Sequence, residues 1–239
     1  MSDKKFQKKL EDYFTNGSDR TFDKLSNFPK YVPRQDLTRF LAKYEIYKKI
    51  LEVDGSIIEC GVKFGGGLMT FAHLSSIFEP VNYTRKIIGF DTFAGFPNLT
   101  KEDKGSVSKF AKKGGFKAES YNDLKKSISL FDSNRFLGEI SKVELIKGDA
   151  THTIPKYIKD NQHLVVSLLY LDFDIYQPTK VAIETFLPRM PKGSIIVFDE
   201  INNPDFVGEP KAVLDTIGLS NLKIKRFSFN TFMSYAILE

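Results

Sequence analysis

Acidic side chains recur at the points where apolar, strand-like segments of this sequence end. They are Glu59, Asp91, Asp149, Asp172 with Asp174, and Asp199 with Glu200. In a parallel α/β sheet the carboxyl ends of the strands meet at one edge, and ligands bind there. Any one of these carboxylates could instead cap a helix or be a satisfied structural group. Their repetition at five strand ends predicts a ligand site at this edge.

A glycine-rich loop follows the first of these strands. Gly61 ends the strand-like run, and Gly65, Gly66 and Gly67 precede a helical pattern. Glycine lets backbone amides approach a ligand closely, and a helix N-terminus favours negative charge. The spacing is not the dinucleotide pattern G-x-G-x-x-G, and the loop lacks the Lys-Ser/Thr pair of a triphosphate site. A nucleotide-cofactor cradle and an ordinary tight loop both fit this segment.

The carboxylates beside the loop suit an adenosine. Asp91 is placed to accept hydrogen bonds from two ribose hydroxyls, and Asp149 to accept from an adenine amino group. Capping of the turn at residues 151–157 is a comparably simple role for Asp149. Glu59 can accept from an amino group of the cofactor, directly or through water. We therefore predict S-adenosylmethionine rather than ATP, bound by Glu59, Gly61, Gly65, Gly66, Asp91, Thr92, Asp149 and Ala150.

The composition narrows the class of protein. The chain has 239 residues, 41% of them hydrophobic, which suits one α/β domain with a sizeable core. Its net charge of +5 comes from lysines interleaved with acidic residues, which indicates a solvated surface rather than a nucleic-acid groove. Cys60 is the single cysteine, so we expect no disulfide and a cytoplasmic, reducing location. No apolar run approaches the ~20 residues of a membrane span, and no signal peptide is expected.

Strand and helix patterns alternate along the chain. The expected strands are Ser56–Gly61, Lys86–Asp91, Lys142–Lys147, Leu164–Asp172 and Ser194–Asp199, with helices after Gly67, Tyr121, Thr153 and Pro178. This alternation predicts an α/β protein with a parallel, doubly wound sheet. Two further strand-like runs, Leu222–Phe229 and Thr231–Leu238, predict a C-terminal hairpin with an antiparallel strand.

Two other segments stand apart from this pattern. Residues 1–35 combine a charged amphipathic helix with a polar, proline-punctuated stretch, and we interpret them as an extension that precedes a domain at 36–239. Residues 98–120 are polar and rich in lysine and glycine. A loop of this length in an α/β domain usually gates a site or is disordered, and we interpret it as a lid loop.

Three motifs resemble the macrocin O-methyltransferase family of sugar methyltransferases. They are Ile57–Val62 with Gly65-Gly66, Gly89–Pro97, and Leu171–Thr179. The match runs from about Pro33 to Asn202, and the Gly-Phe-Asp-Thr-Phe block is its most specific part. The resemblance implies a class I methyltransferase (Rossmann-like) fold with a mostly parallel, seven-stranded sheet. It also implies S-adenosylmethionine as methyl donor, a divalent metal, usually magnesium, and a sugar hydroxyl as acceptor.

The metal can also be argued from the residues. A sugar hydroxyl is a poor nucleophile at neutral pH, and a coordinated cation lowers its pKa and orients it. Asp172, Asp199 and Glu200 supply hard oxygen donors, which suit magnesium or calcium rather than zinc. The resemblance assigns the ligands to these positions, although Glu200 stands where the family usually has Asp or Asn. Asp174 is the candidate general base, so the predicted catalytic residues are Asp172 and Asp174.

Other functions fit parts of the pattern. An O-methyltransferase of catechol-like rings would use the same metal, but it usually brings a lysine to the region of Ile175 and Tyr176. A nucleic-acid methyltransferase is disfavoured because no Asn-Pro-Pro-Tyr-type segment follows the fourth strand. A noncatalytic cofactor-binding module would not need the acceptor-side carboxylates. The expected partner is therefore a small sugar-type acceptor, free or nucleotide-linked. The sequence is compatible with a homo-oligomer, and we expect neither a nucleic acid nor a membrane as a partner.

Overall fold

A computed structural model describes residues 3–239 and divides them into two units, the first ending at Leu41 and the second beginning at Ala42. The first unit contains α1 (Asp3–Asn16), α2 (Thr21–Ser26) and the 3-10 turn η1 (Phe28–Lys30). Helix α3 (Arg34–Lys49) begins in it and continues into the second unit.

Aromatic and polar contacts around Tyr31 hold the first unit together. The Tyr31 ring stacks on Tyr13 at 5.4 Å between centroids and meets Phe14 edge-on at 5.3 Å. Its hydroxyl donates to Asp19 Oδ2 at 2.7 Å, and Lys30 donates to the same oxygen at 2.6 Å. These contacts tie η1 back to α1 and to the turn that precedes α2.

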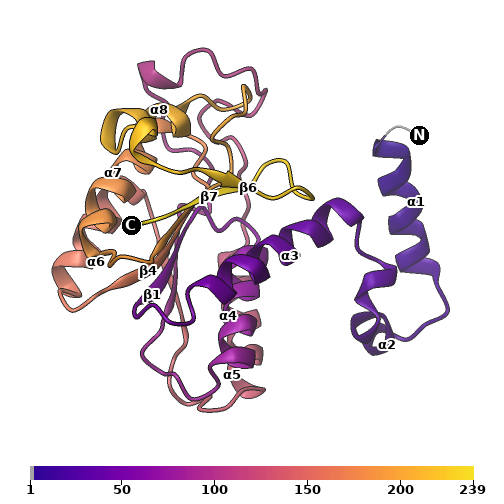
Figure 1. Ribbon diagram of the computed structural model, residues 1–239. Coiled ribbons are helices and arrows are strands. Elements are labelled where there is room, and N and C mark those ends of the chain that lie inside the picture. Colours follow the sequence, from indigo (N-terminus) through magenta and orange to yellow (C-terminus); the bar gives the residue numbers. More distant parts are fainter. Residues whose placement is uncertain (1–2) are drawn as a thin grey trace. The chain divides into compact units, whose positions relative to one another are not determined.

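The second unit is built on a seven-stranded sheet in the order β3-β2-β1-β4-β5-β7-β6 (Figure 1). The strands are β1 (Ser56–Cys60), β2 (Ile87–Asp91), β3 (Val143–Lys147), β4 (Val166–Leu171), β5 (Ile195–Phe198), β6 (Lys225–Arg226) and β7 (Ser234–Ile237). The first five are parallel, and β7 pairs antiparallel with both β5 and β6. The predicted doubly wound, mostly parallel sheet with a C-terminal antiparallel hairpin is confirmed.

Helices pack on both faces of the sheet (Figure 1). They are α4 (Gly66–Phe78), α5 (Tyr121–Ser133), α6 (Ala150–Asp160), α7 (Tyr176–Phe186) and α8 (Gly208–Thr216). Successive strand residues alternate between the two cores: Leu168 and Tyr170 pack with α3, α4 and α5, whereas Leu169 and Leu171 pack with α6, α7 and α8. Burial on both faces explains why the central strands β1, β4 and β5 are mostly apolar. In the part of the chain described here, no helix is long and apolar enough to cross a membrane.

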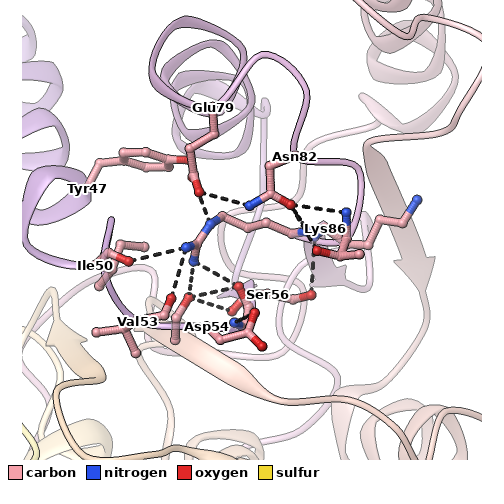
Figure 2. A network of polar contacts seen from close by, with 12 residues as sticks. Tyr47, Ile50, Val53, Asp54, Ser56, Glu79, Asn82 and Lys86 are labelled. Atoms are coloured by element: carbon pink, nitrogen blue, oxygen red, sulfur yellow. Dashed lines mark hydrogen bonds and ion pairs between the residues drawn. The ribbon is translucent and has the colours of Figure 1, made fainter.

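A buried arginine ties together the amino ends of three neighbouring strands (Figure 2). The Arg85 guanidinium donates to the carbonyl of Gly55 at 2.8 Å and to Ser167 Oγ at 2.6 Å. It also donates to the carbonyl of Val53 at 2.9 Å and pairs with Glu79 at 2.8 Å. Because Arg85, Gly55 and Ser167 stand at the starts of β2, β1 and β4, this network fixes the strand edge opposite the carboxyl ends.

Candidate active site

Glycine shapes the exit of β1. Gly61 has a φ of 96°, and a Cβ at this position would lie 2.0 Å from the backbone oxygen of Asp172. Gly65 has a φ of 82° and precedes the first turn of α4. A Cβ on Gly66 would meet nothing within 4 Å. The loop therefore leaves open space beside a helix N-terminus, which fits a ligand that approaches the backbone closely.

The carboxylate of Asp91 organises this loop. Its Oδ2 accepts from the amides of Val62 at 2.8 Å and Lys63 at 2.7 Å, and its Oδ1 accepts from the amide of Phe93 at 2.6 Å. A carboxylate offers about four acceptor positions, so roughly one remains for a ligand. The hydrogen bonds from both ribose hydroxyls to Asp91 stay a prediction. They require that one of the three backbone amides release its hydrogen bond to the carboxylate.

Asp149 has the capping role that the sequence left open. Its Oδ1 accepts from the amide of Thr151 at 2.9 Å and from its hydroxyl at 2.7 Å, at the start of α6. The amide of Gly148 donates to the carbonyl of Asp91 at 2.9 Å, so Asp149, which comes just after β3, lies beside the end of β2. The other oxygen, Oδ2, lies 3.9 Å from His152 Nδ1. Capping through one oxygen is compatible with the predicted adenine contact through the other.

Glu59 supplies a buried acceptor against the first turn of α4. The residue is 3% exposed, and a Cβ on Gly67 would lie 1.9 Å from its Oε1. Its Oε2 is buried and has no hydrogen-bond partner. Burial raises the pKa of Glu59 to about 8, and the nearby Lys43 partly opposes that shift. Buried carboxylate oxygens are normally satisfied, so an unpartnered one fits an amino group supplied by a ligand.

The segment after β4 brings two further acids to this edge. The amide of Asp172 donates to the carbonyl of Cys60 at 2.8 Å, which joins the ends of β4 and β1. Asp174 is buried and has a φ of 63°, in the left-handed region that residues other than glycine rarely adopt. Strain of this kind costs about 1–3 kcal/mol and concentrates at functional sites. Asp174 lies in the tight turn between β4 and α7.

Asp199 and Glu200 end the neighbouring strand. The amide of Asp199 donates to the carbonyl of Leu171 at 3.2 Å, so Asp172 and Asp199 follow directly on paired strand residues. Asp199 is 2% exposed, and its Oδ1 accepts from the hydroxyl of Tyr170 at 2.9 Å. The Glu200 carboxylate accepts from the side-chain amide of Asn203. The structure thus brings all three predicted metal-ligating residues to adjacent strand ends.

These residues match a hard cation in donor type more closely than in arrangement. Carboxylate oxygens are the donors that Mg²⁺ prefers. Between residues 3 and 239, however, no three Asp, Glu, His or Cys side chains stand together as a group that could hold a metal ion.

Sequence reasoning missed Glu209. It is fully buried in the first turn of α8, and its Oε1 accepts from the amide of Glu200 at 3.0 Å. Burial raises its pKa well above the usual range, and the neighbouring Asp199 and Asp174 add to the shift. The signal was an acid in the first turn of a helix soon after the Asp199-Glu200 pair.

Lys43 and Tyr170 were missed as well. Lys43 Nζ donates to the hydroxyl of Tyr170 at 3.1 Å and lies 4.4 Å from the centre of its ring. Lys43, Ile46, Tyr47 and Ile50 have the i, i+3, i+4, i+7 spacing of a buried helix face, and all four are buried. A lysine within an apolar stripe was the available signal.

Residues 98–120 are docked rather than free. The turn η2 (Lys101–Asp103) places Asp103, 4% exposed, so that its Oδ1 accepts from the amide of Tyr176 at 2.8 Å. Farther along, the amide of Val107 donates to the carbonyl of Pro204 at 3.2 Å. The segment is thereby attached to the start of α7 and to the loop that follows β5.

This chain is similar to a known protein family and to several solved structures. The profile of macrocin-O-methyltransferase (TylF) matches residues 37–209. The crystal structure of CalS11, calicheamicin methyltransferase, is 33% identical with a TM-score of 0.94, over 99% of this chain and 93% of that one. The apo structure of CalS11, described as a TDP-rhamnose 3'-O-methyltransferase, is 31% identical with a TM-score of 0.84, over 99% of this chain and 95% of that one.

More distant similarity extends only to the fold. The O-methyltransferase NovP is 16% identical with a TM-score of 0.64, over 84% of this chain and 79% of that one. No sequence among the curated proteins matches the chain. The profile match covers well over half of the residues, and a class I methyltransferase sheet carries the acids described above. The chain therefore belongs to the macrocin O-methyltransferase family and is an O-methyltransferase.

Proposed function

We propose that this protein transfers the methyl group of S-adenosylmethionine to a hydroxyl of a sugar, in a reaction assisted by a divalent cation. One observation carries the proposal. Along 99% of its length the chain shares 31% identity with a TDP-rhamnose 3'-O-methyltransferase, and the same fold lines up its acids at one edge of the sheet. The loop lysines Lys109, Lys112 and Lys113 are exposed and support a nucleotide-linked sugar, because they could neutralise a diphosphate.

The donor half rests on three carboxylates with different surroundings. Glu59 offers its unpartnered Oε2 to the amino group of S-adenosylmethionine. Asp91 offers its remaining acceptor position to the ribose, and Asp149 offers Oδ2 to the adenine. The open space at Gly66 accommodates the donor against the helix N-terminus. S-adenosylmethionine held by these residues would supply its methyl group to an acceptor near the ends of β4 and β5.

The acceptor half rests on Asp172, Asp174 and Asp199. The acceptor oxygen forms a bond to the methyl carbon as the carbon–sulfur bond breaks, and Asp174 takes the hydroxyl proton. A cation held by Asp172, Asp199 and, once it leaves Asn203, Glu200 would lower the pKa of the hydroxyl. Segment 98–120 covers the acceptor, since Asp103 anchors it two residues beyond Asp174. A cytoplasmic location suits the single buried cysteine.

Two measurements test the proposal. Calorimetric titration with S-adenosylhomocysteine, with and without Mg²⁺, should show binding that a chelator leaves nearly unchanged, while the chelator abolishes turnover. Full turnover in excess chelator would show that the reaction needs no metal, and Asp174 would then be the only group proposed to activate the acceptor hydroxyl. Product analysis with a methyl-labelled donor should then place label on nucleotide sugars rather than on catechols, and label on catechols alone would overturn the sugar acceptor.

A further inference from the structure

A buried chain of three polar side chains runs from α3 to the end of β5. Lys43 Nζ donates to the Tyr170 hydroxyl at 3.1 Å, and that hydroxyl donates to Asp199 Oδ1 at 2.9 Å. The exposed fractions of the three residues are 5%, 0% and 2%. An ammonium group and a carboxylate buried this deeply are costly unless each is compensated. The Tyr170 phenol, which lies between the two charges, supplies part of that compensation.

The chemistry of the three groups sets the direction of both of these hydrogen bonds. An ammonium group only donates, an ionised carboxylate only accepts, and a phenol has a single proton to give. Because Lys43 occupies an acceptor position of the Tyr170 oxygen, the phenol proton is directed to Asp199. The carboxylate is therefore held through Oδ1, and its second oxygen keeps one orientation. Orientation of this kind is what an acceptor-side carboxylate at the end of β5 requires.

Lys43 also borders the donor side of the site. A Cβ on Gly67 would lie 1.9 Å from Glu59 Oε1 and 3.0 Å from Lys43 Cε, so both side chains pack against the same glycine. The charge of Lys43 lowers the pKa of Glu59 against the effect of burial. It thereby favours the ionised carboxylate that a ligand amino group needs. One lysine thus faces Glu59 on one side and the Tyr170–Asp199 pair on the other.

We propose that Lys43 and Tyr170 are positioning residues for methyl transfer, with Tyr170 orienting Asp199 toward the acceptor and Lys43 serving both Asp199 and the donor carboxylate Glu59. This inference rests on the proposed function. It predicts an asymmetry between the two residues: loss of the Tyr170 hydroxyl affects the acceptor alone, whereas loss of the Lys43 charge affects both halves of the site.

Tyr170→Phe is the decisive variant, because it removes one oxygen and keeps the ring that packs edge-on against Phe71 at 6.0 Å. We expect the acceptor kcat/KM to fall about 10- to 100-fold, the usual effect of losing a hydrogen bond to a charged group. The Kd for S-adenosylhomocysteine should stay within about twofold of the wild-type value. Lys43→Met should show a similar fall in kcat/KM together with a Kd for S-adenosylhomocysteine that is about fivefold weaker or more.

Two control variants remove a half-buried phenol hydroxyl and a buried ammonium group elsewhere in the fold. Tyr157→Phe removes a hydroxyl that donates to Glu144 at 2.7 Å, and Lys142→Met removes a buried lysine that donates to the carbonyl of Asn82 at 2.5 Å. Neither should change kcat/KM beyond about twofold. If Lys43 acts through Tyr170, the double variant Lys43→Met/Tyr170→Phe should lose no more acceptor kcat/KM than the single variant with the larger loss. In Lys43→Met/Tyr157→Phe, by contrast, the effects of the two substitutions on kcat/KM should be additive.

The outcomes separate this inference from the proposed function. A wild-type protein that binds no S-adenosylhomocysteine, or that methylates no sugar, defeats the proposed function. A wild-type protein that does both, with an unchanged kcat/KM in Tyr170→Phe, defeats only the inference. Equal weakening of donor and acceptor binding in Tyr170→Phe, or additivity of the Lys43 and Tyr170 substitutions, would likewise overturn it.

Discussion

Glu79 Oε2 and Arg85 Nε lie 2.8 Å apart in an ion pair whose arginine side chain is only 3% exposed. The pair stands at the amino ends of the strands, with the hydroxyl of Tyr47 donating to the same glutamate (Figure 2). The predicted site carboxylates, from Glu59 to Glu200, lie at or just beyond the opposite ends. Stability and chemistry are therefore carried by different edges of the same sheet, and each can be tested separately.

The ion pair should contribute strongly to stability. Arg85→Met leaves Glu79 without its cation and removes one donor each from the carbonyls of Gly55 and Val53, so we expect a loss of about 3–5 kcal/mol in the free energy of unfolding. Urea denaturation measures it, and Lys48→Met, at an exposed lysine, is the control that should change little. Affinity for S-adenosylhomocysteine per folded molecule should be unchanged, and a specific loss of affinity would contradict the separation of the two edges.

The glycine loop allows stability and donor binding to be separated residue by residue. Gly66→Ala places a Cβ in open space at the start of α4, so we expect equal or slightly higher stability, by up to about 1 kcal/mol, with weaker binding of S-adenosylhomocysteine. Gly61→Ala forces a Cβ against Asp172 at a positive φ and should lower stability. Thermal melts and calorimetry on both variants check this. If Gly66→Ala bound S-adenosylhomocysteine as tightly as the wild type, the donor could not occupy the space beside Gly66.

Glu59 should make stability depend on pH. Its folded-state pKa is raised to about 8 by burial, whereas an unfolded glutamate titrates near its ordinary value. The folded state then holds a proton that the unfolded state has lost, so the free energy of unfolding should fall as pH rises from about 5 to about 8. Glu59→Gln should flatten that fall and exceed wild type in stability at pH 8, and Glu52→Gln, at an exposed site, should not.

The same pKa predicts proton release when the donor binds. Near pH 7 the amino group of S-adenosylhomocysteine must pair with a Glu59 that gives up its proton. Calorimetry in buffers of different ionisation enthalpy should show that proton for wild type and none for Glu59→Gln, which should also bind more weakly. Equal proton counts in the two proteins would argue that the amino group lies elsewhere.

Asp174 should exchange stability for activity. Its φ of 63° suits glycine, so Asp174→Gly should raise the free energy of unfolding by about 1 kcal/mol or more. Loss of the general base should lower kcat by about 10²- to 10⁴-fold. Leu137→Gly, at a φ of 57°, is the control for backbone relief, with kcat expected to be unchanged. Near-normal turnover in Asp174→Gly would assign the proton to another group.

The sequence predicted the parts of the site that depend on neighbours along the chain. The apolar run ending at Asp172 and the glycines after Glu59 carry their own signals, because strand period and turn chemistry are local. The bond between Lys43 and Tyr170 joins residues 127 positions apart, so no local pattern reveals it. For the same reason, the three hydrogen bonds from backbone amides to the Asp91 carboxylate and the burial of Glu209 became visible only in the folded chain.

Strand β7 is the last strand along the chain, yet it lies between β5 and β6 in the sheet. During synthesis, residues 195–198 of β5 emerge with an apolar edge whose partner has not yet been made. Unpaired strand edges are templates for association with other chains. The edge of β5 therefore stays unpaired until residues 234–237 have left the ribosome, and substitutions that slow the docking of β7 should reduce yield before they affect the finished enzyme.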